Sequence, residues 1–331
     1  MGAFLAIRAG IDEAGLGPLL GPLCLGWSAV RVTHPSDDAW TAWAPLVKRS
    51  LPRGKPAPHV VVADSKKVFA RTAPGRARLE RTALAFLAQR LPGATPPTTL
   101  EALLDAPLAP IGPRGRSACR APWLAATDLP LARHADAGGL ELFAARLARH
   151  IKGSPVALVD AGLRIVPAEE LNASYAQTHN KGTTVLALTF DVLAHLWDQF
   201  ADQGLEVVVD RQGGRAHYGS PLARRFPDAQ VELLEERRGT SSYRLTGRSG
   251  AQRMVVAFTE RGEDHSFTTA LGSCLAKFAR ETVMAAFNAH FQAQDPGLKP
   301  TAGYTTDGRR FLQDAAALVR VLEKEIVVRD R

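Results

Sequence analysis

The sequence predicts an α/β fold whose sheet contains strands of both directions. Apolar runs with strand composition open the chain, and stretches with helical spacing then alternate with further strands. Apolar residues make up 46% and charged residues 22% of the 331 residues, as in ordinary globular proteins. A chain of this length buries a sizeable core, enough for one large domain or two small ones.

The first strands are expected near the amino terminus. Residues 4–12 and 22–32 are apolar runs close enough to pair as a hairpin, and a third strand is predicted over residues 59–64. Residues 75–91 have helical spacing and end before a Pro-Gly pair, so we expect a helix there.

The middle of the chain changes composition. Residues 92–139 are rich in Pro and Ala without a long period, which indicates an insertion or a loosely packed subdomain. A helix over 140–151, an extended segment over 155–166 and a mostly buried helix over 183–203 follow. A short β-rich run over 205–215 contains "EVVVD", which ends on Asp210.

Two or three strands are predicted within residues 230–260, then a long helix over 266–291 and a terminal helix over 308–328. We therefore divide the chain into residues 1–91, an inserted or elaborated segment 92–174, and residues 175–331.

Charge and cysteine content narrow the class of protein. The formal net charge is +8 and the isoelectric point about 9.7, which suits a polyanionic partner such as nucleic acid but is also found in Arg-rich proteins without one. The three cysteines, Cys24, Cys119 and Cys274, have no Cys-x-x-Cys spacing, so a reducing cytoplasm fits better than a disulfide framework or a zinc site. We expect neither export nor a membrane span, because the chain lacks a signal-peptide pattern and a long apolar run.

Several common catalytic motifs are excluded. Gly15, Gly17 and Gly21 do not form a dinucleotide loop, because Pro18 interrupts the spacing and a strand follows where a helix is required. The sequence also lacks a P-loop, a His-Glu-x-x-His motif and a Gly-x-Ser-x-Gly nucleophile elbow.

Carboxylates at strand ends are the remaining candidates. Asp12 and Glu13 follow one apolar strand, and Asp210 ends another. Acidic side chains that meet at strand ends repel one another unless a cation neutralises them, and oxygen ligands favour Mg²⁺ or Mn²⁺. The alternative is that Asp12 and Asp210 only begin turns, as Asp often does.

Five motifs occur in the order found in one known family. "GIDEAGLGPLLGPL" (10–23) resembles the opening motif of type 2 ribonuclease H (ribonuclease HII), and "ADSKK" (63–67) resembles its Asp-Ser-Lys-Lys segment. The strand that ends on Asp210, "ALGSCLAKFARE" (270–281) and "GYTTDGRRFL" (303–312) are similar to three further family segments. The resemblance implies a ribonuclease H-like mixed sheet flanked by helices, with an inserted Pro- and Ala-rich segment.

The resemblance also implies roles for individual residues. It assigns catalysis through Mn²⁺ or Mg²⁺, with two ions during the reaction, to four metal ligands: Asp12, Glu13, Asp210 and Glu281. It assigns recognition of a ribose 2′-hydroxyl to the turn of Gly15, Leu16 and Gly17 with Tyr304. Further substrate contacts are expected at Ser65, Lys66, Lys67, Lys277 and Arg280. The structural alternative for "DSKK" is a helix N-cap followed by two solvated lysines.

The sequence departs from the family at several positions. Leu16 stands where the family has Arg, Glu281 replaces an Asp, and Arg309 occupies the usual place of a His. "DRQGGR" after Asp210 is longer and more basic than the usual Asp-Gly, and the chain carries additional residues mainly between 90 and 175. Specificity therefore need not be that of the family.

One acidic segment has two interpretations. "RGEDHS" (261–266) contains Glu263, Asp264 and His265 directly before the long helix. We expect a solvated loop; the functional alternative is a supporting acid or a proton shuttle near the metals.

The sequence thus predicts a metal-dependent endonuclease acting on RNA in RNA–DNA hybrids or on ribonucleotides embedded in duplex DNA. The alternatives are a catalytically weakened nucleic-acid-binding protein of the same fold, which Leu16 and Glu281 favour, and a nuclease of this fold with another nucleic-acid substrate.

Overall fold

A computed structural model describes residues 6–51, 59–108, 120–125 and 128–330. Seven strands form one sheet in the order β5-β2-β1-β6-β9-β8-β7, while β3 (Val47–Lys48) and β4 (Val60–Val61) pair separately. The seven strands are β1 (Ala6–Ala14), β2 (Leu23–Val32), β5 (Val156–Val166), β6 (Leu205–Asp210), β7 (Ala229–Arg237), β8 (Thr240–Gly247) and β9 (Arg253–Thr259).

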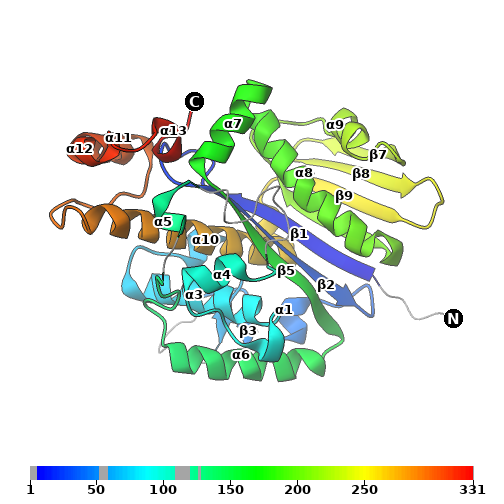
Figure 1. The fold of residues 1–331 in the computed structure, drawn as a ribbon. Helices are drawn as coiled ribbons and strands as arrows, with labels where there is room; N and C mark the ends of the chain where they lie inside the picture. The colour runs from blue at the N-terminus through cyan, green and yellow to red at the C-terminus, as the bar shows by residue number, and fades with distance from the viewer. Residues whose placement is uncertain (1–5, 52–58, 109–119, 126–127, 331) are drawn as a thin grey trace.

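Helices flank the sheet on both faces (Figure 1). The longer ones are α3 (Ala73–Ala88), α6 (Ala137–Lys152), α7 (Ala168–Thr178), α8 (Lys181–Phe200), α10 (Phe267–Gln292) and α11 (Thr305–Asp314). The shorter ones are α1 (Ala39–Ala42), α2 (Ser65–Val68), α4 (Leu100–Asp105), α5 (Pro122–Ala125), α9 (Gly219–Arg225), α12 (Ala316–Val319) and α13 (Lys324–Val327), with 3₁₀ turns η1 (Pro92–Ala94), η3 (Ala201–Gln203) and η4 (Gly262–Asp264).

The sheet contains both strand directions, which confirms the predicted α/β fold class. β1, β6 and β9 run parallel to one another, whereas β1–β2, β2–β5, β9–β8 and β8–β7 are antiparallel pairs. The predicted hairpin of the first two strands is therefore present as β1 and β2. The carboxyl ends of the three parallel strands meet at one edge of the sheet, and this edge carries the candidate site.

The sheet separates two apolar cores because its side chains alternate between faces. Ile7, Ala9 and Ile11 of β1 belong to the core beneath α8. Ala6 of the same strand belongs to the other core, which contains the apolar side chains of α10 and α3.

Helix α10 packs unusually close to the sheet. A Cβ atom on Gly26 of β2 would lie 2.2 Å from the carbonyl oxygen of Gly272, and one on Gly272 would lie 2.7 Å from the oxygen of Gly26. Only glycine permits this approach, since such distances are far below van der Waals contact. The contact places the next residue of α10, Ser273, beside the end of β1.

Two local predictions need correction. The strand expected over residues 59–64 is reduced to β4, because Asp64 caps α2 and the chain turns there. The terminal helix expected over 308–328 is divided into α11, α12 and α13, and this lets residues 328–330 run beside the loop of residues 15–20.

The predicted segment 92–174 is partly built into the main sheet. Strand β5 lies in this segment and pairs with β2 along its whole length. Residues 109–119 and 126–127, which belong to the Pro- and Ala-rich part, lie outside the described residues. The three-part division of the chain stays a prediction.

Cys24 and Cys274 are buried free thiols, and burial raises the pKa of each to about 12. Cys119 lies outside the described residues. Among the residues described, none of the helices combines the length and apolar character that crossing a bilayer requires.

Candidate active site

Four carboxylates gather at the edge where the parallel strands end. Asp12 and Glu13 lie at the end of β1, and Asp210 is the last residue of β6, whose register pairs Ile11 with Val209. Turn η4 follows β9 and brings Glu263 to the same place, where the Gly262 amide donates a hydrogen bond to Asp210 Oδ1 at 3.2 Å.

The two carboxylates of β1 are supported from opposite faces of the sheet. The Ser273 hydroxyl of α10 lies beside the Asp12 carboxylate and opposes the rise in its pKa. Glu13 Oε2 accepts one from Gln212 Nε2 at 3.5 Å, and the same amide donates to Thr189 of α8. Successive residues of a strand face opposite sides, so the pair uses the helices on both faces of the sheet.

Burial and mutual repulsion raise the pKa values of Asp12, Glu13 and Asp210. Burial, together with the charges of Glu13 and Asp210, raises the pKa of Asp12 well above its usual range. Burial and the charge of Asp210 raise the pKa of Glu13 to about 7. Burial and the charge of Glu263 raise the pKa of Asp210 to about 6. A cation at this edge would relieve the repulsion.

The donor atoms fit a hard divalent cation. Glu263 Oε2 and Gln212 Oε1 are buried oxygens without a hydrogen-bond partner. Carboxylate and amide oxygens are the ligands that Mg²⁺ and Mn²⁺ prefer. Within the described ranges, no three His, Cys, Asp or Glu side chains are arranged closely enough to form a complete ligand set.

Glu281 is not part of this group. Its carboxylate pairs with Lys277 Nζ at 2.6 Å and with Arg76 at 3.8 Å. It lies eight positions after Ser273 in α10, which corresponds to about 12 Å along the helix axis. The structure therefore groups Glu263, and not Glu281, with Asp210, and places Glu281 in an ion-paired cluster on α10.

The sequence contains a signal that identifies Glu263. Glu263 lies a few residues after the end of the apolar strand β9, just as Asp12 and Asp210 lie at the ends of β1 and β6. Strand β9 is parallel to both β1 and β6. The expectation of a solvated loop is wrong for Glu263, whose exposed fraction is 9%. Asp264 instead pairs with Lys67 Nζ at 2.6 Å.

The "DSKK" segment forms the N-terminus of α2. The Asp64 side chain accepts a hydrogen bond from the Lys66 amide at 2.9 Å, which confirms the N-cap. Ser65 is buried, and its hydroxyl accepts a hydrogen bond from Ser273 Oγ at 3.0 Å, so it supports the neighbour of Asp12.

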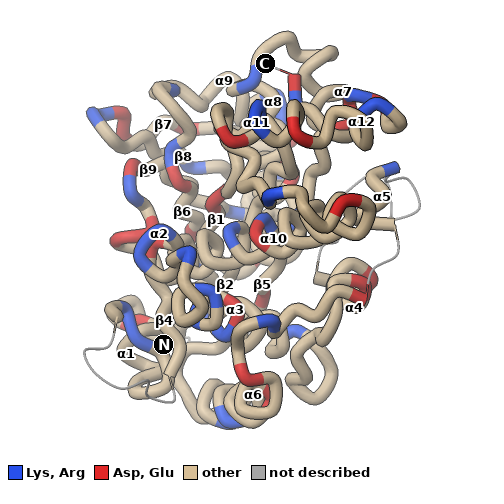
Figure 2. Tube along the Cα trace, turned by 90° about the vertical axis from the view of Figure 1, so that its left-hand side faces the viewer, with Lys and Arg blue, Asp and Glu red and all other residues tan. Residues whose placement is uncertain are grey.

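Helices α2 and α10 carry basic residues, whose positions along the chain are blue in Figure 2. Lys66 is exposed, and its charge opposes the raised pKa of both Glu13 and Asp210. Lys277 is paired with Glu281 and lies 4.4 Å from the centre of the Phe69 ring. Arg280 has an exposed fraction of only 2%, so of the four predicted phosphate-binding cations it is the least accessible.

The predicted ribose turn lies between α10 and the segment before α11. Gly15 has a φ of +94°, and a Cβ atom there would lie 2.6 Å from the Pro22 oxygen. Leu16 packs against the core beneath α8. Tyr304 is 48% exposed, and the guanidinium carbon of Arg280 lies 5.5 Å from the centre of its ring. The structure thus brings Arg280 to both the glycine turn and Tyr304.

Comparisons with known proteins give similarity to solved structures and no match to curated protein sequences or protein-family models. Similarity is found among solved structures of ribonucleases HII and HIII. The chain from the PCNA:RNase HII complex of Archaeoglobus fulgidus is 14% identical with a TM-score of 0.41, and the alignment covers 98% of this chain and 94% of that one. Ribonuclease H2 from Pyrococcus horikoshii OT3 is 12% identical with a TM-score of 0.39 over 97% and 92% of the two chains. Bst-RNase HIII in complex with Mn²⁺ is 14% identical with a TM-score of 0.39 over 99% and 66%.

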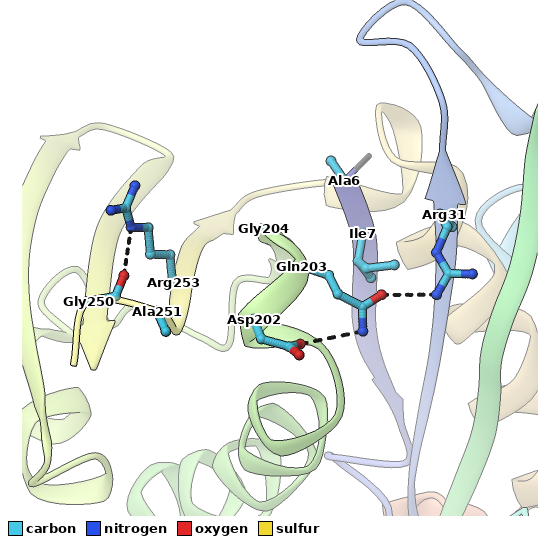
Figure 3. Close-up of a pocket in the computed structure, with 9 residues that line it drawn as sticks. All are labelled: Ala6, Ile7, Arg31, Asp202, Gln203, Gly204, Gly250, Ala251 and Arg253. Carbon is cyan, nitrogen blue, oxygen red and sulfur yellow. Dashed lines mark hydrogen bonds between the residues drawn. The ribbon is translucent and has the colours of Figure 1, made fainter. Parts of the chain in front are cut away.

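A pocket of about 540 Å³ lies at the opposite end of the same strands (Figure 3). It is lined by Ala6 and Ile7 of β1, and β1 rises about 20 Å between Ala6 and Asp12. Three of its polar side chains bond to one another: Arg31 donates to Gln203 Oε1 at 3.0 Å, and Gln203 Nε2 donates to Asp202 Oδ1 at 3.4 Å. The pocket is therefore separate from the carboxylate edge.

Proposed function

We propose that the protein is a divalent-metal-dependent endonuclease that hydrolyses RNA in RNA–DNA hybrids or at ribonucleotides embedded in duplex DNA, and that it acts in the cytoplasm. The observation that carries this proposal is the convergence of Asp12, Glu13, Asp210 and Glu263 at the carboxyl ends of β1, β6 and β9. The ordered sequence motifs of ribonuclease HII supply the substrate class.

The four carboxylates would hold Mg²⁺ or Mn²⁺. When bound, two such cations supply water activation and stabilisation of the leaving oxygen in phosphodiester hydrolysis. The protein keeps the carboxylates in place through Ser273 on one face of the sheet and Gln212 on the other.

Other residues meet the substrate strand. Lys66 is exposed beside the carboxylates and neutralises phosphate charge there. Gly15 and Gly17 let the backbone approach a sugar, and the 2′-hydroxyl is the group that distinguishes RNA from DNA. The exposed ring of Tyr304 offers a surface on which a sugar or base packs.

Leu16 favours a second candidate within the same fold. Its side chain packs into the core beneath α8 and presents no charge to a phosphate. A nucleic-acid-binding protein with weak catalysis, or a nuclease with another substrate, would share the carboxylate edge and differ at this turn.

The deciding experiment is cleavage of three end-labelled duplexes with and without Mn²⁺: an RNA–DNA hybrid, a DNA duplex with one embedded ribonucleotide, and an all-DNA duplex. We expect Mn²⁺-dependent cleavage of the first two only. Asp210→Asn, which keeps the shape of the side chain but removes its charge, is the matched variant, and we expect its cleavage to fall by about a hundredfold or more, equal to ~2.7 kcal/mol.

Binding of all three duplexes without cleavage would replace the proposal with the weakened binding protein. Cleavage of the all-DNA duplex at an equal rate would replace the substrate class. Wild-type cleavage that Asp210→Asn leaves unchanged, in a variant folded by circular dichroism, would remove Asp210 from the site.

A further inference from the structure

The last residues of the chain lie directly against the glycine turn. The Arg329 amide donates a hydrogen bond to the Leu19 oxygen at 3.0 Å, and Leu20 and Val328 form an antiparallel bridge. The carboxyl-terminal segment thus runs beside residues 15–20, although about 310 positions separate the two in sequence.

The side chain of Arg329 reaches beneath the turn itself. Its guanidinium donates hydrogen bonds to the Gly15 oxygen and, at 3.3 Å, to the Leu16 oxygen. The side chain is 2% exposed, and in the part of the chain that the structure describes no carboxylate lies within ion-pair distance of it. A buried cation is costly unless acceptors surround it. Arg329 Nε has no hydrogen-bond partner among the described residues, so the guanidinium depends on the turn oxygens, and the two groups hold each other in place.

The segment that carries Arg329 is fixed from its other side. Asn172 of α7 donates to the Val328 oxygen at 2.8 Å and accepts from the Asp330 amide at 2.7 Å. The residues on both sides of Arg329 are therefore anchored to α7. The guanidinium is presented to the turn by a support that does not depend on the turn.

The orientation of the two carbonyls fixes the orientation of two amides. In a trans peptide the C=O and N–H bonds point in opposite directions. Because the Gly15 and Leu16 oxygens point toward the buried guanidinium, the Leu16 and Gly17 amides point away from it. Gly17 is exposed, and these two amides have no acceptor among the described residues.

We propose that Arg329 is a positioning residue: it holds the turn of Gly15, Leu16 and Gly17 so that two backbone amides face the ribose of the substrate strand. The inference rests on the proposed function for its substrate. It also explains how the turn is ordered although Leu16 has no polar side chain. The Arg329 guanidinium, from the carboxyl-terminal segment, donates the hydrogen bonds that order the Gly15 and Leu16 carbonyls.

The test compares Arg329→Gln with Arg320→Gln, which removes an exposed arginine from the same terminal region. Binding of the embedded-ribonucleotide and all-DNA duplexes is measured by fluorescence anisotropy in EDTA, and kcat and KM are measured with Mn²⁺. The preference is the ratio of affinities for the embedded-ribonucleotide and all-DNA duplexes. We expect Arg329→Gln to lower this ratio about tenfold or more, equal to ~1.4 kcal/mol. The loss should appear mainly in KM, and Arg329→Lys, which keeps the charge and some donors, should restore part of the preference.

Hydrogen exchange gives a readout that does not depend on nuclease activity. The Leu19 and Leu20 amides donate to the Gly303 oxygen at 2.8 and 3.0 Å. We expect faster exchange of these amides in Arg329→Gln than in Arg320→Gln, with α8 and α10 unchanged. If the wild-type protein neither cleaves nor prefers ribonucleotides, the proposed function fails while the exchange result still decides the role of Arg329.

A folded Arg329→Gln variant with wild-type exchange at residues 15–20 and wild-type preference would overturn the inference. If Arg329→Gln does not fold, Arg329→Lys carries the same two measurements. In that variant, unchanged exchange and unchanged preference overturn the inference in the same way.

Discussion

Asp12 and Glu13 are neighbours in β1, yet their side chains depend on different helices. Asp12 lies beside Ser273 of α10, and Glu13 bonds to Gln212, which bonds to Thr189 of α8. Two adjacent carboxylates at a strand end therefore reach both layers of helices. Asp210 and Glu263 complete the group from β6 and from the turn after β9.

Glu263 and Glu281 form a matched pair of glutamates for testing the fourth position. Glu263→Gln removes a charge that acts on Asp210, so we expect cleavage to fall by about a hundredfold, equal to ~2.7 kcal/mol. Glu281→Gln removes a partly exposed ion pair with Lys277, which contributes little, so we expect a change of at most about threefold. Single-turnover cleavage of the hybrid duplex with Mn²⁺ measures both. The reverse order of effects would return the fourth position to Glu281.

Tyr304 is expected to act on selectivity more than on affinity. Its ring is exposed beside the glycine turn, where it can pack on the sugar that carries the 2′-hydroxyl. Tyr304→Ala should weaken binding of the embedded-ribonucleotide duplex by about tenfold, ~1.4 kcal/mol. Binding of the all-DNA duplex should change much less. Equal losses for the two duplexes in anisotropy titrations would assign the ring to general backbone contact.

At the scale of elements, the packing of α10 on β2 sets the position of Ser273 beneath Asp12. Gly26→Ala would place a methyl group 2.2 Å from the Gly272 oxygen and force α10 away from the sheet. Overpacking of this kind costs about 1–3 kcal/mol of the free energy of unfolding. Gly214→Ala is the control, because a Cβ atom there meets nothing within 4 Å.

Denaturation in urea measures both glycine variants, and cleavage assays show whether displaced Ser273 affects the site. We expect Gly26→Ala to lose both stability and cleavage, while Gly214→Ala stays within about 0.5 kcal/mol of wild type. Equal free energies of unfolding for the two variants would mean that α10 can move away from the sheet without loss of stability.

Local sequence pattern predicts most helices and strands of this fold, because the residues that favour each one lie next to one another in the sequence. The alternation in residues 205–210 and the helical spacing in 267–292 need no distant residue to be recognised. The breaks between α11, α12 and α13 could not be predicted in this way. They precede the contacts of Val328 and Arg329 with the loop of residues 15–20, which join the two ends of the chain and leave no local pattern.

The same distinction holds for the site. Asp12, Glu13 and Asp210 lie at strand ends that are visible in the sequence, and the structure brings them together. To predict Glu263 as a member of the site, one must know that β9 pairs parallel with β6. That pairing is a property of the folded sheet and is not recorded in a short stretch of sequence. The burial of Arg280 could not be predicted locally either. Its guanidinium donates a hydrogen bond to the Ala302 oxygen at 2.9 Å, a contact between segments that are distant in the sequence.

At the scale of the whole molecule, the formal net charge is +8. We expect a few accessible Lys and Arg side chains to account for its effect on nucleic-acid binding. Each phosphate neutralised on duplex DNA contributes about −0.9 to the slope of log affinity against log salt. Lys66→Gln should reduce the steepness of this slope by about 0.9. Lys152→Gln, at the exposed end of α6, is the control and should leave it unchanged. Anisotropy titrations of the hybrid duplex between two salt concentrations test this, and a flat slope for the wild type would remove the nucleic-acid partner.

The stability that these carboxylates contribute to the metal-free protein should fall as pH rises from 3.8 to about 7. The pKa of Glu13 is raised from 4.5 to about 7 and that of Asp210 from 3.8 to about 6 on folding. Between the usual and the raised values, the folded state retains protons that the unfolded chain has released. The free energy of unfolding contributed by these groups therefore decreases as pH rises through this window and stays low above it.

A bound divalent cation should reverse this trend, because it binds the ionised carboxylates and removes their repulsion. We expect millimolar Mn²⁺ to raise the melting temperature more at pH 8 than at pH 5.5, relative to protein in EDTA. Asp210→Asn lacks one of the repelling charges, so without metal it should melt above the wild type at pH 8, and Mn²⁺ should raise its melting temperature less. Thermal melts of both proteins at the two pH values test this. Equal Mn²⁺ shifts at pH 5.5 and pH 8, or equal shifts in the two proteins, would mean that the cation binds elsewhere and that the carboxylate edge is not the metal site.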